Sequence, residues 1–249
     1  MNKNNLLNEA SEVTSECGNS KISQDDSQTR ERFVVFLDIM GFKDIVRTNP
    51  NHDELKKRLG ELNDKINKLI ETEEATSIIE LVQFSDSIIL FTKSNSNEQL
   101  VKLVSIVCLI MQEAIELKFA MKGAMAKGIL TCDSNKNVYF GQAQIDAYLL
   151  EENVWYYGIV VHHSAQSDVE KIKENYISTL NLPMKTGWIK HCELSWYAYS
   201  SNKTSDIKER ISNIRYTVSD APRRYIDNTE AVMKAFEEKK VAQSIKTKQ

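Results

Sequence analysis

The sequence predicts an α+β fold, a split βαβ (ferredoxin-like) arrangement in which an antiparallel-rich sheet is covered by helices. Short β-branched runs alternate with longer segments whose apolar residues recur at helical spacing, in the order strand, helix, strand, strand, helix, strand. The runs 78–84 and 87–92 are separated only by Ser85 and Asp86, which predicts a tight hairpin. The hydrophobic content of 41% supplies a sizeable core, and the chain has no Gly- or Ser-rich linker.

Each element has its own signal. A buried strand is expected at 33–37, followed by an amphipathic helix within 43–74 with Leu55, Leu59, Leu62 and Ile66 on one face and Asp53 as a possible cap. The remaining expected elements, in chain order, are a buried helix at 97–119, a strand pair at 121–132 and 136–142 with a polar turn at 133–136, a short helix at 143–153, a strand at 155–164, a helix at 166–181 and a strand at 187–199.

Three regions are expected along the chain. Residues 1–30 are rich in Asn, Ser and Glu with few periodic apolar positions, which predicts a disordered tail. Residues 31–200 hold all the predicted strands and form the main domain. Residues 201–249 are a charged helical extension, with a break at Ala221–Pro222.

Composition argues against several classes of protein. The 32 basic and 35 acidic side chains are mixed along the sequence, so no nucleic-acid or membrane partner is expected. No apolar run approaches the roughly 20 residues that span a bilayer, and no signal peptide is apparent. Cys17, Cys108, Cys132 and Cys192 lack CxxC spacing, which argues against a zinc site and favours a reduced, cytoplasmic setting, with Cys108 in the core.

The stretch "FVVFLDIMGF" places a carboxylate, Asp38, at the end of a strand that looks buried on both faces. An unpaired charge there would cost several kcal/mol, so a positive partner is expected. A second carboxylate, Asp86, lies in the predicted hairpin. Alone, Asp86 is explained by turn chemistry, and Asp38 could accept hydrogen bonds from local amides. Together, at neighbouring strand ends, they can converge.

Two converging carboxylates call for a shared cation. Hard oxygen ligands with open positions suit two divalent ions, Mg²⁺ or Mn²⁺, that bridge to a polyphosphate. Gly41 follows closely and would let backbone amides approach phosphate oxygens. The pattern therefore predicts a two-metal phosphoryl-transfer site.

These residues resemble the class III nucleotidyl cyclases. "FVVFLDIMGF" is similar to that family's first metal motif, "QFSDSIIL" to its second, and "KGAMAKG" with "VYFGQAQIDAYLLE" to its later strand and dimer-interface helix; the resemblance covers roughly residues 33–151. It implies that Asp38, Asp86 and the Ile39 carbonyl bind the metals. It also implies that the amides of Met40, Gly41 and Phe42 hold phosphates.

Departures from the family concern the substrate. Val82 and Val138 stand where purine cyclases carry base-reading residues and cannot make those hydrogen bonds, and Ile145 and Leu149 replace the usual Asn and Arg of the interface helix. With these substitutions the chain resembles the anti-phage cyclases of the Pycsar system, which make cyclic UMP or cyclic CMP. In that group Phe36, on the same strand face as Asp38, can border the base.

Other charged residues have ordinary alternatives. Lys122 and Lys127 could neutralise phosphate or protect a strand edge. Arg215, Arg223 and Arg224 could supply the missing cation or form a solvated helical face. His162 and His163, as neighbours on a strand, would point to opposite faces and not chelate together.

The expected activity is attack of a ribose 3′-oxygen on the α-phosphate of UTP or CTP, with release of pyrophosphate. A homodimer is expected, because sites of this family draw on both subunits, and a separate effector would sense the product. Two alternatives stay open, a cyclase-like domain that binds nucleotide without turnover and a purely structural dimerisation module.

Overall fold

The computed structural model describes residues 29–48, 51–200, 204–216 and 218–246. Its elements are β1 (Thr29–Ile39), α1 (Phe42–Thr48), α2 (His52–Thr72), β2 (Ile79–Phe84), β3 (Ser87–Thr92), α3 (Asn97–Glu116), β4 (Met121–Asp133), β5 (Val138–Phe140), α4 (Gln142–Asn153), β6 (Ile159–Val161), α5 (His163–Lys171), β7 (Ile177–Met184), β8 (Gly187–Leu194), a 3-10 turn (Trp196–Ala198), α6 (Thr204–Ile214) and α7 (Ala221–Lys246).

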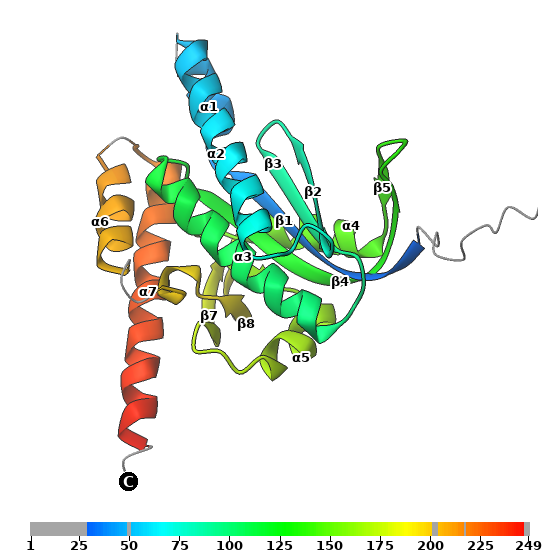
Figure 1. Ribbon diagram of the computed structural model, residues 1–249. Helices are drawn as coiled ribbons and strands as arrows, with labels where there is room; N and C mark the ends of the chain where they lie inside the picture. Colours follow the sequence, from blue (N-terminus) through cyan, green and yellow to red (C-terminus); the bar gives the residue numbers. More distant parts are fainter. Residues whose placement is uncertain (1–28, 49–50, 201–203, 217, 247–249) are drawn as a thin grey trace, which may run out of the picture.

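The strands form one mixed sheet in the order β2-β3-β1-β4-β6-β8-β7, with β5 paired to β4 (Figure 1). The pairs are antiparallel apart from β4 with β6, which run parallel. The α+β prediction is confirmed, and so is the hairpin of β2 and β3, in which Ser85 takes a left-handed φ of 58°.

Side-chain alternation along β1 separates two cores. Phe33, Val35, Leu37 and Ile39 are buried in the larger core, to which α2 and α3 contribute their apolar stripes. The other face of β1 packs in a smaller core with Ala143 and Ala147 of α4. A strand covered on both faces reads as a continuous apolar run, which is why β1 looked buried from the sequence.

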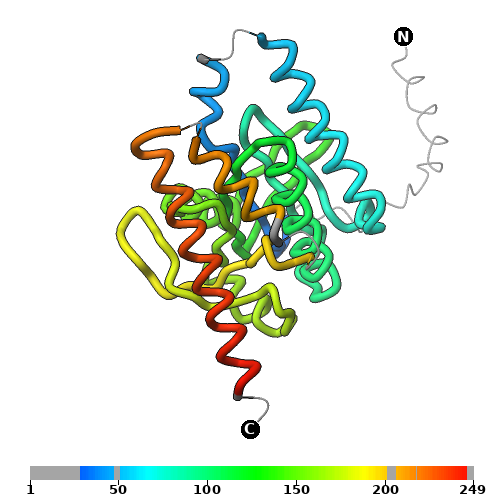
Figure 2. The backbone as a smooth tube through the Cα atoms, turned by 90° about the vertical axis from the view of Figure 1, so that its left-hand side faces the viewer, coloured from blue at the N-terminus to red at the C-terminus, as the bar shows by residue number. Residues whose placement is uncertain are grey.

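The two C-terminal helices belong to the main core. Ile207 and Ile211 of α6 and Val232 and Phe236 of α7 are buried in the larger cluster. Figure 2 shows α6 and α7 lying side by side against the body of the protein. The boundary at residue 200 stays a prediction, and most of the expected tail, 1–28, lies outside the described residues.

Several expected boundaries were wrong. The first strand is longer than 33–37 and includes Thr29 and Arg30. The helix within 43–74 is two helices, of which the first ends at Thr48 and the second begins at His52. The side chain of Asn51, not Asp53, caps α2 by accepting a hydrogen bond from the Glu54 amide.

The helix expected at 166–181 was also wrong in its second half. It ends at Lys171, and 177–184 forms β7, where exposed and buried side chains alternate. Lys173 between them has a φ of 54°, which helices do not accommodate. The last expected strand ends at Leu194, before the 3-10 turn.

Cys108, Cys132 and Cys192 are free thiols, and Cys108 lies in the core as expected. Cys17 lies outside the described residues. No helix in the described part of the chain is long and apolar enough to cross a bilayer.

A substitution at Gly123 of β4 tests the close contact between β1 and β4. A Cβ at this position would lie 2.5 Å from a Leu37 methyl carbon and 2.6 Å from the Phe36 carbonyl oxygen. We expect Gly123→Ala to lower the free energy of unfolding by about 1–3 kcal/mol, because backbone must move to relieve the overlap. Urea denaturation measures the change.

Gly60→Ala is the matched control. Gly60 lies within α2, and a Cβ there would meet no atom within 4 Å. We expect this variant to gain up to about 1 kcal/mol, since Ala has the higher helix propensity. Equal effects of the two substitutions would contradict the packing assigned to Gly123.

Candidate active site

Asp38 and Asp86 lie at the same end of the sheet. Asp38 is the penultimate residue of β1, and its partner in the antiparallel register with β3 is Ser87, the residue directly after Asp86. The Ile39 amide donates to the Asp86 carbonyl oxygen at 3.0 Å, which fixes the hairpin against the end of β1. The convergence of the two strand ends expected from the sequence is therefore present.

Lys122 and Glu151 complete the charged cluster. Lys122 of β4 is the register partner of Asp38, so the two side chains share one face of the sheet. Its ammonium lies 2.9 Å from Glu151 Oε1 and donates to the Glu151 backbone carbonyl at 2.9 Å. Lys122 and Glu151 are both buried, and the pair ties the C-terminal end of α4 to the strand beside Asp38.

Negative charge is in excess around Asp38. Burial, together with the carboxylates of Glu151 and Asp86, raises the pKa of Asp38 to about 7, against the opposing effect of Lys122. Burial also raises the pKa of Glu151, against the effect of Lys122. The half-buried Asp38 thus has two neighbouring carboxylates that disfavour its ionised form, and the charge that opposes them is the single ammonium of Lys122.

This arrangement fits a divalent cation. Carboxylate oxygens are the preferred ligands of Mg²⁺ and Mn²⁺, and a bound ion would replace the proton on Asp38. Among the described residues, no group of three or more His, Cys, Asp or Glu side chains is placed to hold a metal by itself. Asp38 and Asp86 would therefore leave coordination positions open for backbone carbonyls and for a ligand.

The loop after β1 contains the residues expected to hold phosphate. Gly41 has a φ of 71°, a conformation that residues with a Cβ rarely adopt, and its carbonyl accepts the amides of Asp44 and Ile45. The Met40 amide was expected to hold phosphate, but it donates a hydrogen bond to the Ala120 carbonyl at 2.8 Å. It is engaged within the fold and is not available to phosphate in this conformation, which leaves Gly41 and Phe42 as the expected donors.

Phe36 lies on the same face of β1 as Asp38, under α4. Its ring makes an edge contact with Tyr148 of α4, with centroids 5.4 Å apart. The Tyr148 hydroxyl donates to Glu152 at 3.0 Å, and Tyr148 is 42% exposed. An aromatic wall therefore stands beside Asp38, and the sequence revealed only its Phe36 half.

The positions that differ from the purine cyclases are spread over several elements. Val82 lies half-buried on β2 and packs against the smaller core, while Val138 of β5 is 41% exposed. Ile145 and Leu149 are each 50% exposed on α4. None of these four side chains lines the groove between α2 and β2 or the cavity behind the loop after β1, both described below.

Lys127 lies away from this site. It is the register partner of Phe33, on the sheet face opposite to Lys122, and its ammonium pairs with Asp168 at 2.9 Å and Glu31 at 3.4 Å. Lys127 lies five positions after Lys122, and an odd difference in position along a strand places two side chains on opposite faces. The pairing of these two lysines around phosphate was therefore wrong.

The arginines of the C-terminal segment are engaged elsewhere. Arg215 pairs with Asp227 and with Glu230, which joins α6 to α7. Arg223 donates to the Arg215 carbonyl at 3.1 Å, and the Arg224 guanidinium lies 4.4 Å from the centre of the Trp155 ring. The contacts of Arg215 and Arg223 join α6 to α7, and Arg224 packs on the ring of Trp155 before β6. None of these contacts involves Asp38.

The argument about His162 and His163 was wrong in its premise. β6 ends at Val161, and His162 caps α5 while His163 begins it. The two rings consequently lie close together, with centroids 4.0 Å apart. Burial and the neighbouring His163 lower the pKa of His162.

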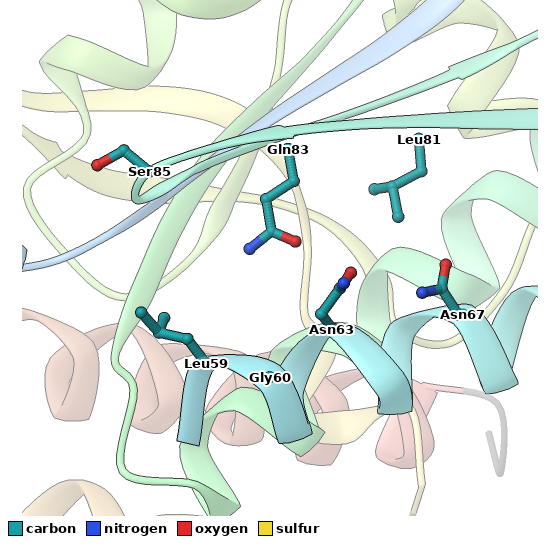
Figure 3. Close-up of a pocket in the computed structure, with 7 residues that line it drawn as sticks. All are labelled: Leu59, Gly60, Asn63, Asn67, Leu81, Gln83 and Ser85. Carbon is teal, nitrogen blue, oxygen red and sulfur yellow. The ribbon is translucent and has the colours of Figure 1, made fainter. Parts of the chain in front are cut away.

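A shallow groove lies behind the β2–β3 hairpin, between α2 and β2 (Figure 3). It is lined by Leu59, Gly60, Asn63 and Asn67 of α2 and by Leu81, Gln83 and Ser85 on the β2 side, and its volume is about 600 Å³. Figure 3 shows the amide side chains of Gln83 and Asn63 pointing toward each other across it. No charged side chain lines this groove, so it offers no counter-charge to a polyphosphate.

Sequence reasoning missed Glu151 and the role of Lys122, although a signal for Glu151 was present. Ala143, Ala147 and Glu151 are the buried residues of α4 and follow one another at spacings of four. A glutamate on such a buried stripe requires a buried partner. The partner is the lysine that the β1–β4 register sets beside Asp38.

Comparisons with known proteins bear on the fold. No family model matches the chain, and no curated protein matches it. Solved structures do. They include the adenylyl cyclase CyaB from P. aeruginosa, with 14% identity, a TM-score of 0.53 and coverage of 67% of this chain and 94% of that one.

Two further structures agree. The catalytic core of a rhodopsin-guanylyl cyclase with converted specificity, in complex with ATPαS, has 16% identity, a TM-score of 0.52 and coverage of 66% of this chain and 95% of that one. A bacterial light-regulated adenylyl cyclase has 16% identity, a TM-score of 0.51 and coverage of 76% and 99%. At these identities the likeness concerns architecture: the chain has the α+β fold of adenylyl and guanylyl cyclase domains.

Proposed function

We propose that this protein is a nucleotidyl cyclase that converts UTP or CTP to the 3′,5′-cyclic monophosphate and pyrophosphate. The observation that carries the proposal is the meeting of Asp38 and Asp86 beside the Gly41 loop, in a cyclase-like fold and with an excess of negative charge. The site then binds a nucleoside triphosphate with two divalent ions, Mg²⁺ or Mn²⁺.

Each residue has a defined task in this reaction. The bound ions would lower the pKa of the ribose 3′-hydroxyl and offset the charge of the triphosphate. Asp38, Asp86 and the Ile39 carbonyl hold them, and the Gly41 and Phe42 amides face the phosphates. The 3′-oxygen bonds to the α-phosphorus, the bond to the β-phosphate bridge breaks, and the 3′-proton leaves to solvent. Lys122 keeps Glu151 paired, so that Glu151 does not compete for the cation.

The side chains around the expected base position favour a pyrimidine. Val82 and Val138 offer no hydrogen bond to a purine edge, and a pocket that leaves buried base groups unpaired discriminates against that base. Phe36 and Tyr148 narrow the space beside Asp38 with aromatic surface. By its resemblance to the Pycsar cyclases, the product is a second messenger in anti-phage defence that a separate effector senses.

Incubation of the purified protein with each of the four NTPs and Mn²⁺ tests the reaction and its base. We expect cyclic UMP or cyclic CMP as the main product, identified by mass, because the purine-reading positions are apolar. Asp38→Ala and Asp86→Ala should abolish product formation while the fold is retained. Asp64→Ala, an exposed carboxylate on α2, is the control and should leave turnover unchanged.

Cyclic AMP or cyclic GMP as the main product would contradict the pyrimidine assignment. Turnover by Asp38→Ala or by Asp86→Ala would contradict the metal assignment. The replacement of Asn and Arg by Ile145 and Leu149 favours one alternative, a cyclase-like domain that binds nucleotide without turnover. Nucleotide binding without product from any NTP would support it.

Metal binding should depend on pH through Asp38. Because the pKa of Asp38 is raised to about 7, the carboxyl is mostly protonated below that pH, and Mn²⁺ must displace the proton. We expect Mn²⁺ affinity to rise by up to about tenfold per pH unit toward pH 7 and to level off above it. Electron paramagnetic resonance of free Mn²⁺ measures it. A flat profile between about pH 5.5 and 7 would count against Asp38 as a ligand.

We also propose a homodimer formed through α4 and the β4–β5 arm. Large apolar side chains are exposed on both, namely Ile145, Tyr148 and Leu149 on α4 and Ile129, Val138 and Phe140 on the arm. Exposed apolar surface of this extent marks interaction sites. Figure 1 shows β5 on an arm that extends from the sheet, next to α4.

Leu149→Asp tests this interface. We expect sedimentation velocity to show a dimer for the natural sequence and a monomer for the variant, because a charge in an apolar interface core loses its hydration. Val241→Asp is the control, since Val241 is 59% exposed on α7. A monomeric natural protein, or an unaffected Leu149→Asp dimer, would contradict the proposal.

A further inference from the structure

A second cavity lies behind the loop that follows β1, where the C-terminal end of α3 meets the first residues of α7. Its volume is about 860 Å³, within the range of small-molecule sites. Its wall includes Met40 and Gly41, and α1, α2 and both C-terminal helices also line it. In Figure 1 the start of α7 lies beside this end of α3.

The walls of the cavity are mostly apolar. Ile45 comes from α1, Ile115 from α3, and Val218 and Pro222 from the segment that starts α7, and each lines the cavity. Tyr225 closes one side, where its ring stacks on Tyr157 with centroids 5.9 Å apart. Such walls suit the body of an organic molecule better than a free inorganic ion, which would gain little from them.

Positive charge is concentrated at the same cavity. Arg58, Lys118 and Arg210 line it, and the acidic side chain among the lining residues is Asp44, which pairs with Arg47 at 3.0 Å. In the described parts of the chain, no carboxylate forms an ion pair with Arg58, Lys118 or Arg210. The cavity therefore presents net positive charge to an occupant.

The three cations differ in how they are held. Arg58 Nη2 donates to the Leu117 carbonyl at 2.8 Å, and its guanidinium lies 4.5 Å from the centre of the Phe119 ring. Capping of α3 explains Arg58 by itself. Capping of α3 does not explain why Lys118 and Arg210, which are both exposed, lie at the same cavity. Charge at the rim and apolar surface inside define a ligand with an anionic group and an apolar body.

We propose that this cavity binds a small organic anion, with its apolar body against Ile115, Val218 and Pro222 and its anionic group at Arg58, Lys118 and Arg210. The proposal does not depend on cyclase activity, because it rests on side chains outside the carboxylate cluster. Charge-assisted contacts of this kind contribute more than neutral ones, so the anionic group should add measurably to affinity.

Two fluorescent probes separate charge from apolar contact. 8-Anilinonaphthalene-1-sulfonate carries an anionic group, and N-phenyl-1-naphthylamine has the same rings without it. By fluorescence titration of the full chain, we expect the sulfonate to saturate one site per chain and to bind at least about tenfold more tightly than the neutral probe.

Paired variants locate the probe. Lys118→Gln combined with Arg210→Gln should weaken sulfonate binding by about tenfold or more and leave the neutral probe within about twofold. Ala221→Trp, which fills the cavity, should weaken both probes. Lys57→Gln combined with Lys190→Gln removes two exposed charges elsewhere and should change neither. Thermal unfolding checks that each variant is folded.

Three results would overturn the proposal. Sulfonate affinity could be unchanged when Lys118 and Arg210 are neutralised, which would remove the anion site. Both probes could keep their affinity in folded Ala221→Trp, which would place them on another apolar surface, such as the exposed face of α4. The control variant could lose as much affinity as the cavity variant, which would reduce the effect to general electrostatic attraction.

Discussion

The antiparallel pairing of β1 with β4 is the constraint on which the candidate site depends. It extends from Thr29 to Ile39 and sets Asp38 beside Lys122. The next residue, Gly123, has no room for a Cβ, so the two strands approach closely next to the carboxylate. A shift of one residue in the β1–β4 register would turn Asp38 toward the larger core, which consists of hydrophobic side chains. The register that fills both cores therefore also positions the chemistry.

Charge balance follows from this register. Lys122 is committed to Glu151 by two contacts of 2.9 Å, so it compensates Asp38 only in part. This buried pair resists rearrangement, because breaking it would leave an uncompensated buried charge. Asp38 consequently keeps a deficit of positive charge around it, which is reflected in its raised pKa and which a divalent ion would offset in a complex.

The sequence predicted the parts of the site that local patterns encode. Asp38 and Asp86 follow apolar strands, and the two-residue connection made the hairpin evident. It could not predict contacts that depend on long-range register or on where a strand stops. The Met40 amide turns to Ala120, Lys127 points to the other face, and β6 ends before His162. Single-sequence periodicity places such ends only within a few residues.

Helix α7 is joined to the strand beside Asp38 through the segment before β6. Asn228 donates to the Trp155 carbonyl at 2.7 Å, and the Tyr157 amide donates to Thr229 Oγ1 at 2.9 Å. Gly158 in turn accepts the Gly123 amide at 2.8 Å, so α7 is anchored to the strand that carries Lys122.

Tyr225 shows that this connection is also electrostatic. Burial raises its pKa, and the negative charges of Glu151 and Asp38 raise it further. The same ring lines the second cavity, behind the loop that follows β1, whose lining also includes Met40 and Gly41. A cation bound at Asp38 would remove part of the negative field that acts on Tyr225. The charges of Asp38 and Glu151 therefore influence a side chain in the first turns of α7. The sequence alone had predicted this helix as part of a separate charged extension.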